Sequence, residues 1–171
     1  MSSSVTTSDP VRPHPHLHSH VVEAILWGGT LAGILDIADA FIVSGFYGVS
    51  PPRVLQAIAS GLLGRASFSG GVSTAALGLG LHFFIAFTAA AVYVLASLKL
   101  PMLIRRPLVS GAIYGVIVWL VMREVVLPLS LFNQGRLTLI GLLNGLFAHI
   151  FCVGLPIALA ARQRVTPPST R

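Results

Sequence analysis

Charged side chains are scarce in this sequence. Asp, Glu, Lys and Arg together make up 9% of the 171 residues, and only five residues are acidic. A soluble domain carries about 25% charged residues, because its surface must stay hydrated. So few charges cannot cover a globule of this size, whereas hydrophobic residues account for 54% of the chain. This balance predicts an integral membrane protein, and the length predicts a single folded domain.

Cysteine and the common catalytic motifs are also lacking. The one cysteine, Cys152, lies inside an apolar run. No intrachain disulfide can form, and the redox compartment stays open. The sequence contains no Ser-His-Asp arrangement, no phosphate-binding P-loop and no HExxH zinc helix. These absences predict that the chain is not an enzyme.

Long apolar segments take the place of the missing charges. Each exceeds the roughly 20 residues that a helix needs to cross about 30 Å of hydrocarbon. They lack apolar–polar alternation, which favours helices over a closed barrel. The segments lie near residues 22–47, 72–98, 107–129 and 138–161. We therefore expect an all-α integral membrane protein with four transmembrane helices over residues 21–162 and disordered tails at 1–20 and 163–171. The first twenty residues lack a basic n-region, so the first helix is expected to be retained.

The Lys and Arg residues divide unequally between the two sides of the membrane. Seven lie in the two tails and in the connection between the second and third spans, and four lie on the other side. Because cytoplasmic loops carry an excess of Lys and Arg, both termini are predicted to be cytoplasmic, in a bacterial inner membrane. The net charge of +6 is spread between the apolar runs. The expected partner is therefore the lipid bilayer and not nucleic acid.

The connection after the first span predicts a short helix of its own. Ser50-Pro51-Pro52 is typical of a helix start, and Gly64 is suited to end the helix. About 14 residues are too few to span a bilayer, so we expect an amphipathic helix that lies in the interface or dips back into the membrane. Its apolar stripe at helical spacing consists of Val54, Leu55, Ile58, Ala59, Leu62 and Leu63.

The two halves of the chain resemble each other in the placement of glycine and histidine. Such parallel repeats occur in transporters, but GxxxG also recurs by chance, so duplication and coincidence both stay open. The small faces left by these glycines also suit a homo-oligomer. The corresponding positions in the two halves are Gly29-x-x-x-Gly33 with Gly111-x-x-x-Gly115, and His82 with His149.

Polar residues inside the apolar segments are costly at membrane depth and are therefore informative. Asp36, His82 and His149 stand in rows of small residues, which mark close helix contacts, so we expect them to face the bundle at mid-depth. Asp39 and Arg123 are predicted to share a depth of about 24 Å from the cytoplasmic side, and we expect them to form an ion pair. The candidate site residues are Asp36, Asp39, His82, Arg123, Glu124, Asn144 and His149.

Three interpretations of these residues stay open. They can tie helices together through hydrogen bonds worth about 0.6–2 kcal/mol each. They can line a pathway for protons, ions or metals. His82 and His149 can also hold a b-type haem. The first interpretation is favoured, because no transport signature accompanies the residues. We therefore expect a structural or accessory membrane protein with no cofactor, and a small transport component is the alternative.

The N-terminal tail contains a histidine tract at His14, His16, His18 and His20. Alternation in an extended chain places the four imidazoles on one side, where Zn²⁺, Ni²⁺ or Cu²⁺ can bind. Short His tracts also bind metals weakly without serving a purpose. A metal site and a plain flexible tail therefore both stay open.

Several longer stretches of the sequence suggest a relationship to a known group of proteins. They are Ile58-Ala-Ser-Gly-Leu-Leu-Gly64, Phe68-Ser-Gly-Gly71, Ala76-Leu-Gly-Leu-Gly-Leu-His82-Phe83, Tyr114-Gly115, Val121-Met122 and Val125-Val-Leu-Pro-Leu-Ser130. Together they resemble an uncharacterised family of small four-helix bacterial inner-membrane proteins, over roughly residues 22–162. The resemblance implies a location and a fold, and it implies no activity or site residues.

Overall fold

The computed structural model describes residues 15–165, with side chains from residue 19 onward, and all of the secondary structure in that range is helical. The first two long helices are α1 (Pro15–Phe46) and α3 (Gly71–Lys99). The third rod consists of α5 (Pro107–Val121), η2 (Met122–Val126) and α6 (Leu127–Leu129). The fourth rod consists of α7 (Leu139–Phe147), η3 (Ala148–Gly154) and α8 (Leu155–Val165). Three shorter elements connect the rods: α2 (Pro51–Leu63), the 3₁₀ helix η1 (Gly64–Ser69) and α4 (Met102–Arg105).

Four helical stretches within residues 15–165 are long and apolar enough to cross a membrane. They are Ser19–Phe46, Gly71–Lys99, Pro107–Leu129 and Leu139–Val165. The all-helical fold with four candidate spans, predicted from the apolar runs, is therefore confirmed.

The first helix begins earlier than the sequence predicted. Its backbone is helical from Pro15, whereas the tail was expected to run to residue 20. Proline suits this position, because a residue in the first helical turn needs no N–H donor. The extended geometry expected for the histidine tract therefore does not hold from His16 to His20, and His14 lies outside the described residues. Within the described range, no group of three or more His, Cys, Asp or Glu residues is placed to hold a metal ion.

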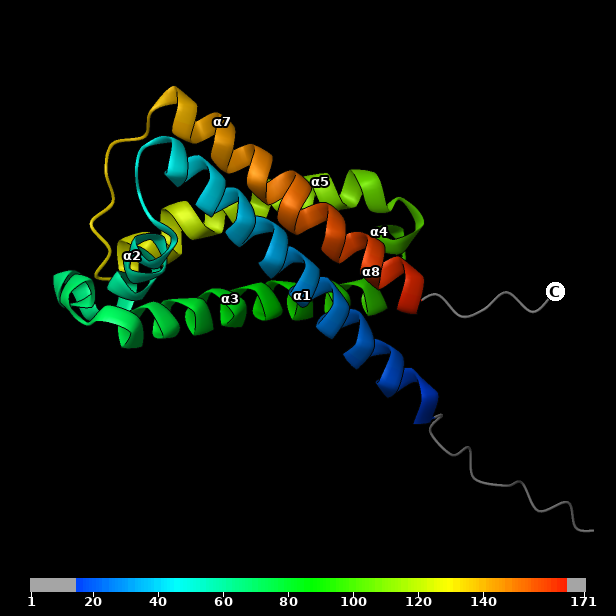
Figure 1. The fold of residues 1–171 in the computed structure, drawn as a ribbon. Coiled ribbons are helices and arrows are strands. Elements are labelled where there is room, and N and C mark those ends of the chain that lie inside the picture. Colours follow the sequence, from blue (N-terminus) through cyan, green and yellow to red (C-terminus); the bar gives the residue numbers. More distant parts are fainter. Residues whose placement is uncertain (1–14, 166–171) are drawn as a thin grey trace, which may run out of the picture.

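The long helices alternate in direction. Figure 1 shows α1 and the fourth rod side by side, crossing over α3 and the third rod. The described chain begins and ends at one end of the bundle, which we call the terminal end. The other end carries α2, η1 and the connection over residues 130–138, and we call it the α2 end.

The terminal end of the bundle is tightly packed. Buried residues such as Tyr93, Val94 and Ile157 form its core together with several alanines. Tyr114 donates a hydrogen bond to the Ala89 carbonyl at 2.7 Å, which joins α5 to α3. The ring of Tyr114 also lies 4.9 Å from the ring of Tyr93, centroid to centroid. The helices of this half therefore leave little space between them.

Helix α2 forms where the sequence predicted it. Ser50 occupies the N-cap, Pro51 opens the helix, and Gly64 follows it with a φ of 58°, a left-handed backbone that favours glycine. The helix packs on the start of α3, where Gly78 lies directly against the Leu55 carbonyl. The predicted stripe is divided, because Val54 and Ala59 are buried and the last two leucines are exposed. Its depth relative to a membrane stays a prediction.

Both rods of the second half contain a π-helical segment, and each segment lies just before a proline. Segment η2 ends two residues before Pro128, and η3 ends two residues before Pro156. Proline donates no N–H and its ring clashes with the carbonyl four residues earlier, so the local hydrogen bonds shift to a wider turn. Such wide turns occur often at functional sites.

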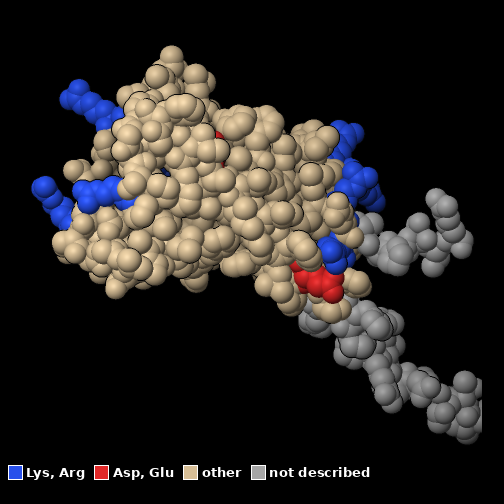
Figure 2. Space-filling view, viewed as in Figure 1, with Lys and Arg blue, Asp and Glu red and all other residues tan. Residues whose placement is uncertain are grey.

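Apolar side chains cover much of the outer surface. On α1 alone, Leu26, Ile34 and Ile42 are 53%, 51% and 62% exposed. Water-soluble monomers rarely expose large contiguous apolar patches. On the face drawn in Figure 2, Lys and Arg gather at the two ends of the molecule and leave a broad belt between them that is almost entirely free of charged atoms. This distribution is the one that a bilayer favours.

Candidate functional site

A partly open cavity of about 560 Å³ lies between the helices in the half of the bundle nearer α2. Every long rod contributes to its wall, and so do α2 and the 130–138 connection. Small-molecule sites in proteins have volumes of about 300–1,000 Å³ and are mostly apolar with a few polar groups. The cavity has that character, since its wall is made chiefly of aliphatic side chains such as Ile58, Ile85 and Val118.

Three ionisable residues meet at this cavity. Asp36 comes from α1, His82 from α3 and His149 from η3, and all three line its wall. They lie at one depth, because Asp36 is ten residues from Phe46, His82 eleven from Gly71, and His149 ten from Leu139 at the α2 end of each span. At about 1.5 Å per residue, that depth is roughly 15 Å.

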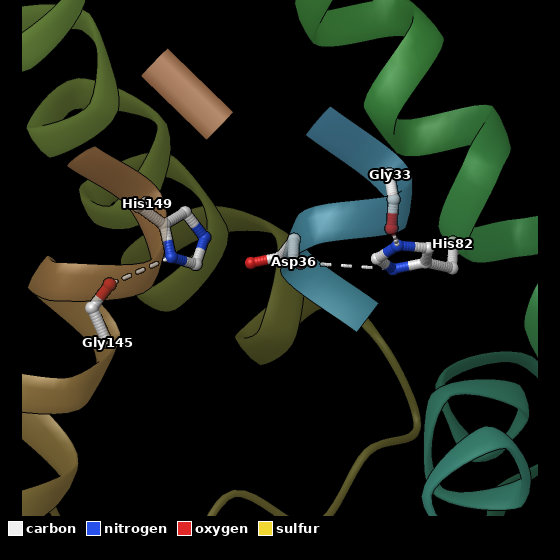
Figure 3. Close-up of polar contacts among 5 residues, drawn as sticks. All are labelled: Gly33, Asp36, His82, Gly145 and His149. Carbon is white, nitrogen blue, oxygen red and sulfur yellow. Dashed lines mark hydrogen bonds and ion pairs between the residues drawn. The ribbon is translucent and has the colours of Figure 1, made fainter. Parts of the chain in front are cut away.

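The carboxylate of Asp36 lies between the two imidazoles (Figure 3). Its Oδ2 atom is 4.0 Å from Nδ1 of His82. On the other side, an oxygen of Asp36 points toward the ring of His149. Neither histidine forms a hydrogen bond with Asp36. The three side chains therefore line the same cavity without bonding to one another.

Backbone carbonyls fix the orientation of both imidazoles. Nε2 of His82 is 2.8 Å from the carbonyl oxygen of Gly33, on the neighbouring helix. Nδ1 of His149 is 2.9 Å from the carbonyl oxygen of Gly145, one turn earlier in its own rod. A carbonyl only accepts hydrogen bonds, so we assign the proton of each neutral imidazole to the nitrogen that contacts the carbonyl. The remaining nitrogen of each ring is then an acceptor.

Asp39 and Arg123 do not form the predicted ion pair. Asn144 donates from Nδ2 to Oδ2 of Asp39 at 3.3 Å. Nε of Arg123 lies 3.4 Å from Oε1 of Glu124. No ion pair within 4.0 Å joins Asp39 to Arg123 in the described part of the chain. The prediction was wrong because shared depth does not place two side chains on facing sides of their helices, and Asp39 faces the fourth rod.

Two further parts of the cavity wall were missed at the sequence level. Trp119 lines the cavity from α5, and Ser130 and Phe132 line it from the connection between the third and fourth rods. Trp119 follows Gly115 by four residues and precedes Met122 by three, so helical spacing could have placed it on the inner face. The connection carries no such periodicity. It reaches the cavity because the amide of Leu131 donates to the Gly61 carbonyl at 2.9 Å.

The arrangement does not fit a haem held by His82 and His149. Asp36 lies between the two rings, where the macrocycle would have to stand. Nε2 of His82 is also committed to the Gly33 carbonyl. We therefore assign no haem chemistry to this pair.

The scan against protein-family models and the searches of curated proteins and of solved structures found no match to this chain.

Proposed function

We propose that this chain is a multi-pass protein of a bacterial inner membrane with both termini in the cytoplasm. We propose further that it is a small transport component, and that Asp36, His82 and His149 form its site for a proton or cation. The four apolar spans and the exposed apolar belt support the membrane location. The excess of Lys and Arg in the tails and the second connection supports the orientation.

The observation that carries the transport proposal is the cavity that joins the three ionisable residues. A charged or ionisable group in hydrocarbon is expensive, and proteins keep such groups chiefly where they line an ion or proton path. If these residues served only to tie helices together, their polar atoms would be expected to bond to one another. Instead, Oδ2 of Asp36 is 4.0 Å from Nδ1 of His82 with no hydrogen bond between them, and all three side chains line the cavity.

The position of the cavity fits a transport site that is accessible from one side of the membrane at a time. Its wall includes Leu62, Ser130 and Leu137 near the α2 end. Toward the terminal end, the bond from Tyr114 to Ala89 and the packed core close the bundle. Under the predicted orientation, we assign this geometry to an outward-facing state. Passage would then require the terminal half to loosen, and the π-helical segments η2 and η3 are suitable places for the rods to bend.

A flux measurement tests the proposal. Purified protein is reconstituted into liposomes, and a potassium diffusion potential drives protons or added monovalent cations inward. A trapped pH-sensitive dye reports proton entry, and tracer uptake reports entry of the cations. We expect flux above that of empty liposomes, and Asp36→Asn should abolish most of it. Asp39→Asn is the matched control, because Asp39 lies three residues away on the same helix and bonds to Asn144. Flux equal to empty liposomes, or unchanged flux in Asp36→Asn, would reject the proposal.

A structural or accessory role is the second candidate, and specific contacts favour it. The bonds from His82 to Gly33, from Asn144 to Asp39 and from Tyr114 to Ala89 each join different rods. A purely structural role predicts that Asp36→Asn changes thermal stability without affecting any flux. The transport proposal predicts that Asp36→Asn abolishes flux with little change in thermal stability. The reason is that the Asp36 carboxylate accepts no hydrogen bond within the described part of the chain.

A further inference from the structure

The three ionisable side chains that line the cavity present hydrogen-bond acceptors to it. Asp36 contributes a carboxylate, which accepts only when ionised. His82 contributes Nδ1 and His149 contributes Nε2, and both are acceptors because the other nitrogen of each ring donates to a carbonyl. With Asp36 ionised and both imidazoles neutral, these three side chains carry a formal charge of −1 and offer three groups that can accept an N–H bond.

We infer that this cavity binds a lipophilic organic cation whose charged group carries N–H donors, with a protonated primary amine as the simplest case. The ammonium group would bind Asp36 between His82 and His149, and the apolar body would lie along the aliphatic wall. A primary ammonium has three N–H donors and no acceptor, which matches the three accepting groups. The inference rests on the proposed transport role, because it names the class of cation that this same site takes.

The size and lining of the cavity favour an organic cation over a proton or a bare ion. A proton or a metal ion needs only a few ligands and no apolar chamber, whereas this chamber has a volume of about 560 Å³. No group of three or more His, Cys, Asp or Glu among residues 15–165 is close enough to hold a metal. Apolar walls exclude strongly hydrated ions, but they stabilise the hydrocarbon part of an amine by burying it.

The other charged groups near the cavity do not reverse its polarity. Arg123 lines the wall closer to the α2 end, and its guanidinium lies 3.4 Å from the carboxylate of Glu124. Asp39 is adjacent along α1 but accepts a bond from Asn144. The charge available to a ligand at the level of the two imidazoles is therefore that of Asp36.

Tryptophan fluorescence offers a direct test, because Trp119 lines the cavity and Trp27 does not. In a Trp27→Phe protein held in lipid nanodiscs, Trp119 is the single tryptophan. The probes are 4-phenylbutylammonium, its trimethylammonium analogue without N–H donors, and the uncharged 4-phenylbutanol. We expect saturable quenching or shift by the primary ammonium, and at least tenfold weaker binding of the other two, as for the loss of charged hydrogen bonds.

Substitution of Asp36, which would bind the ammonium group, completes the test. Asp36→Asn should weaken binding of the primary ammonium by roughly tenfold to a hundredfold, whereas Asp39→Asn should leave it within about twofold. Equal affinity for all three probes, no saturable signal, or unchanged binding in Asp36→Asn would overturn the inference. If Asp36→Asn does not fold, the comparison of the three probes on the Trp27→Phe protein still decides.

The two proposals can fail separately. Asp36-dependent cation or proton flux without amine binding would reject the amine class and keep the transport role. Selective amine binding without flux of protons, cations or the amine itself would reject transport and keep the binding site.

Discussion

The two halves of the chain, α1 to α3 and the third and fourth rods, use the same residue types in different ways. In the first half, the second glycine of a GxxxG pair, Gly33, lies against α3 and bonds to His82. In the second half, the corresponding Gly115 lies against the fourth rod beside the backbone of His149. Each half therefore brings one histidine to the shared cavity. The sequence left duplication and coincidence open, and this correspondence is compatible with both; α2 and η1 occur in the first half only.

The difference between the halves lies in their helical regularity. The helices α1 and α3 run without a π-helical segment, whereas both rods of the second half contain one, each just before a proline. His82 is held by a bond to a different helix, and His149 by a bond within its own rod. The comparison indicates that the first half provides a regular framework and that the second half contains the interruptions around the site.

The largest expected effect concerns the two glycines at corresponding positions. A Cβ atom at Gly115 would lie 2.7 Å from the Ile150 Cα and would also meet the His149 carbonyl, and backbone atoms cannot move aside. Gly115→Ala should therefore destabilise the fold by about 1–3 kcal/mol or more. Gly33→Ala should cost less, because its Cβ would meet the Phe83 ring at 2.6 Å and a side chain can rotate away. Thermal unfolding in detergent micelles, followed by size-exclusion chromatography, measures both variants.

An equal loss of stability in the two glycine variants would contradict the distinction between a backbone contact and a side-chain contact.

A moderate effect is expected when the two histidines are exchanged for phenylalanine. His82→Phe removes a bond between two helices, which contributes about 0.6–1.7 kcal/mol in membrane proteins. His149→Phe removes only a bond within one rod and should lower the melting temperature less. Both substitutions should weaken amine binding, since each removes one acceptor from the cavity. A larger loss of stability in His149→Phe than in His82→Phe would contradict the assignment of their roles.

The smallest effect is expected at the proline that follows η3. Pro156→Ala restores an N–H that can donate to the Cys152 carbonyl, so residues 148–154 should return toward regular α-helical bonding. Hydrogen–deuterium exchange across that segment should slow, while overall stability changes by about 1 kcal/mol or less. Pro101→Ala, in the connection before α4, is the control and should leave exchange at 148–154 unchanged. Unaltered exchange in Pro156→Ala would show that proline does not cause the wide turn.

Local sequence features predicted the elements of the fold well. The four apolar runs exceed the length of a bilayer-crossing helix, and each forms a long helical stretch. Ser50, Pro51 and Gly64 mark the limits of α2 through backbone preferences that act within a few residues. Helix α1 begins earlier than its polar first residues predict, because Pro15 can open a helix.

The candidate site was predictable only in part. The positions of Asp36, His82 and His149 in rows of small residues indicated that they share a depth and face other helices. The same reasoning failed for Asp39 and Arg123, whose partners are Asn144 and Glu124. Depth follows from counting residues along one helix, whereas a partner depends on the rotation and crossing of two helices.

The amino-acid sequence by itself determined how many apolar spans there are, where they begin and end to within a few residues, and at which level along each helix the polar groups lie. These properties depend on the length of apolar runs and on local backbone preferences. Only the tertiary structure decided that the terminal half packs closed, that a cavity remains in the half near α2, and that Trp119 and the 130–138 connection line it. Those properties depend on how far apart the helices are held by side chains from distant parts of the chain, which no single segment specifies.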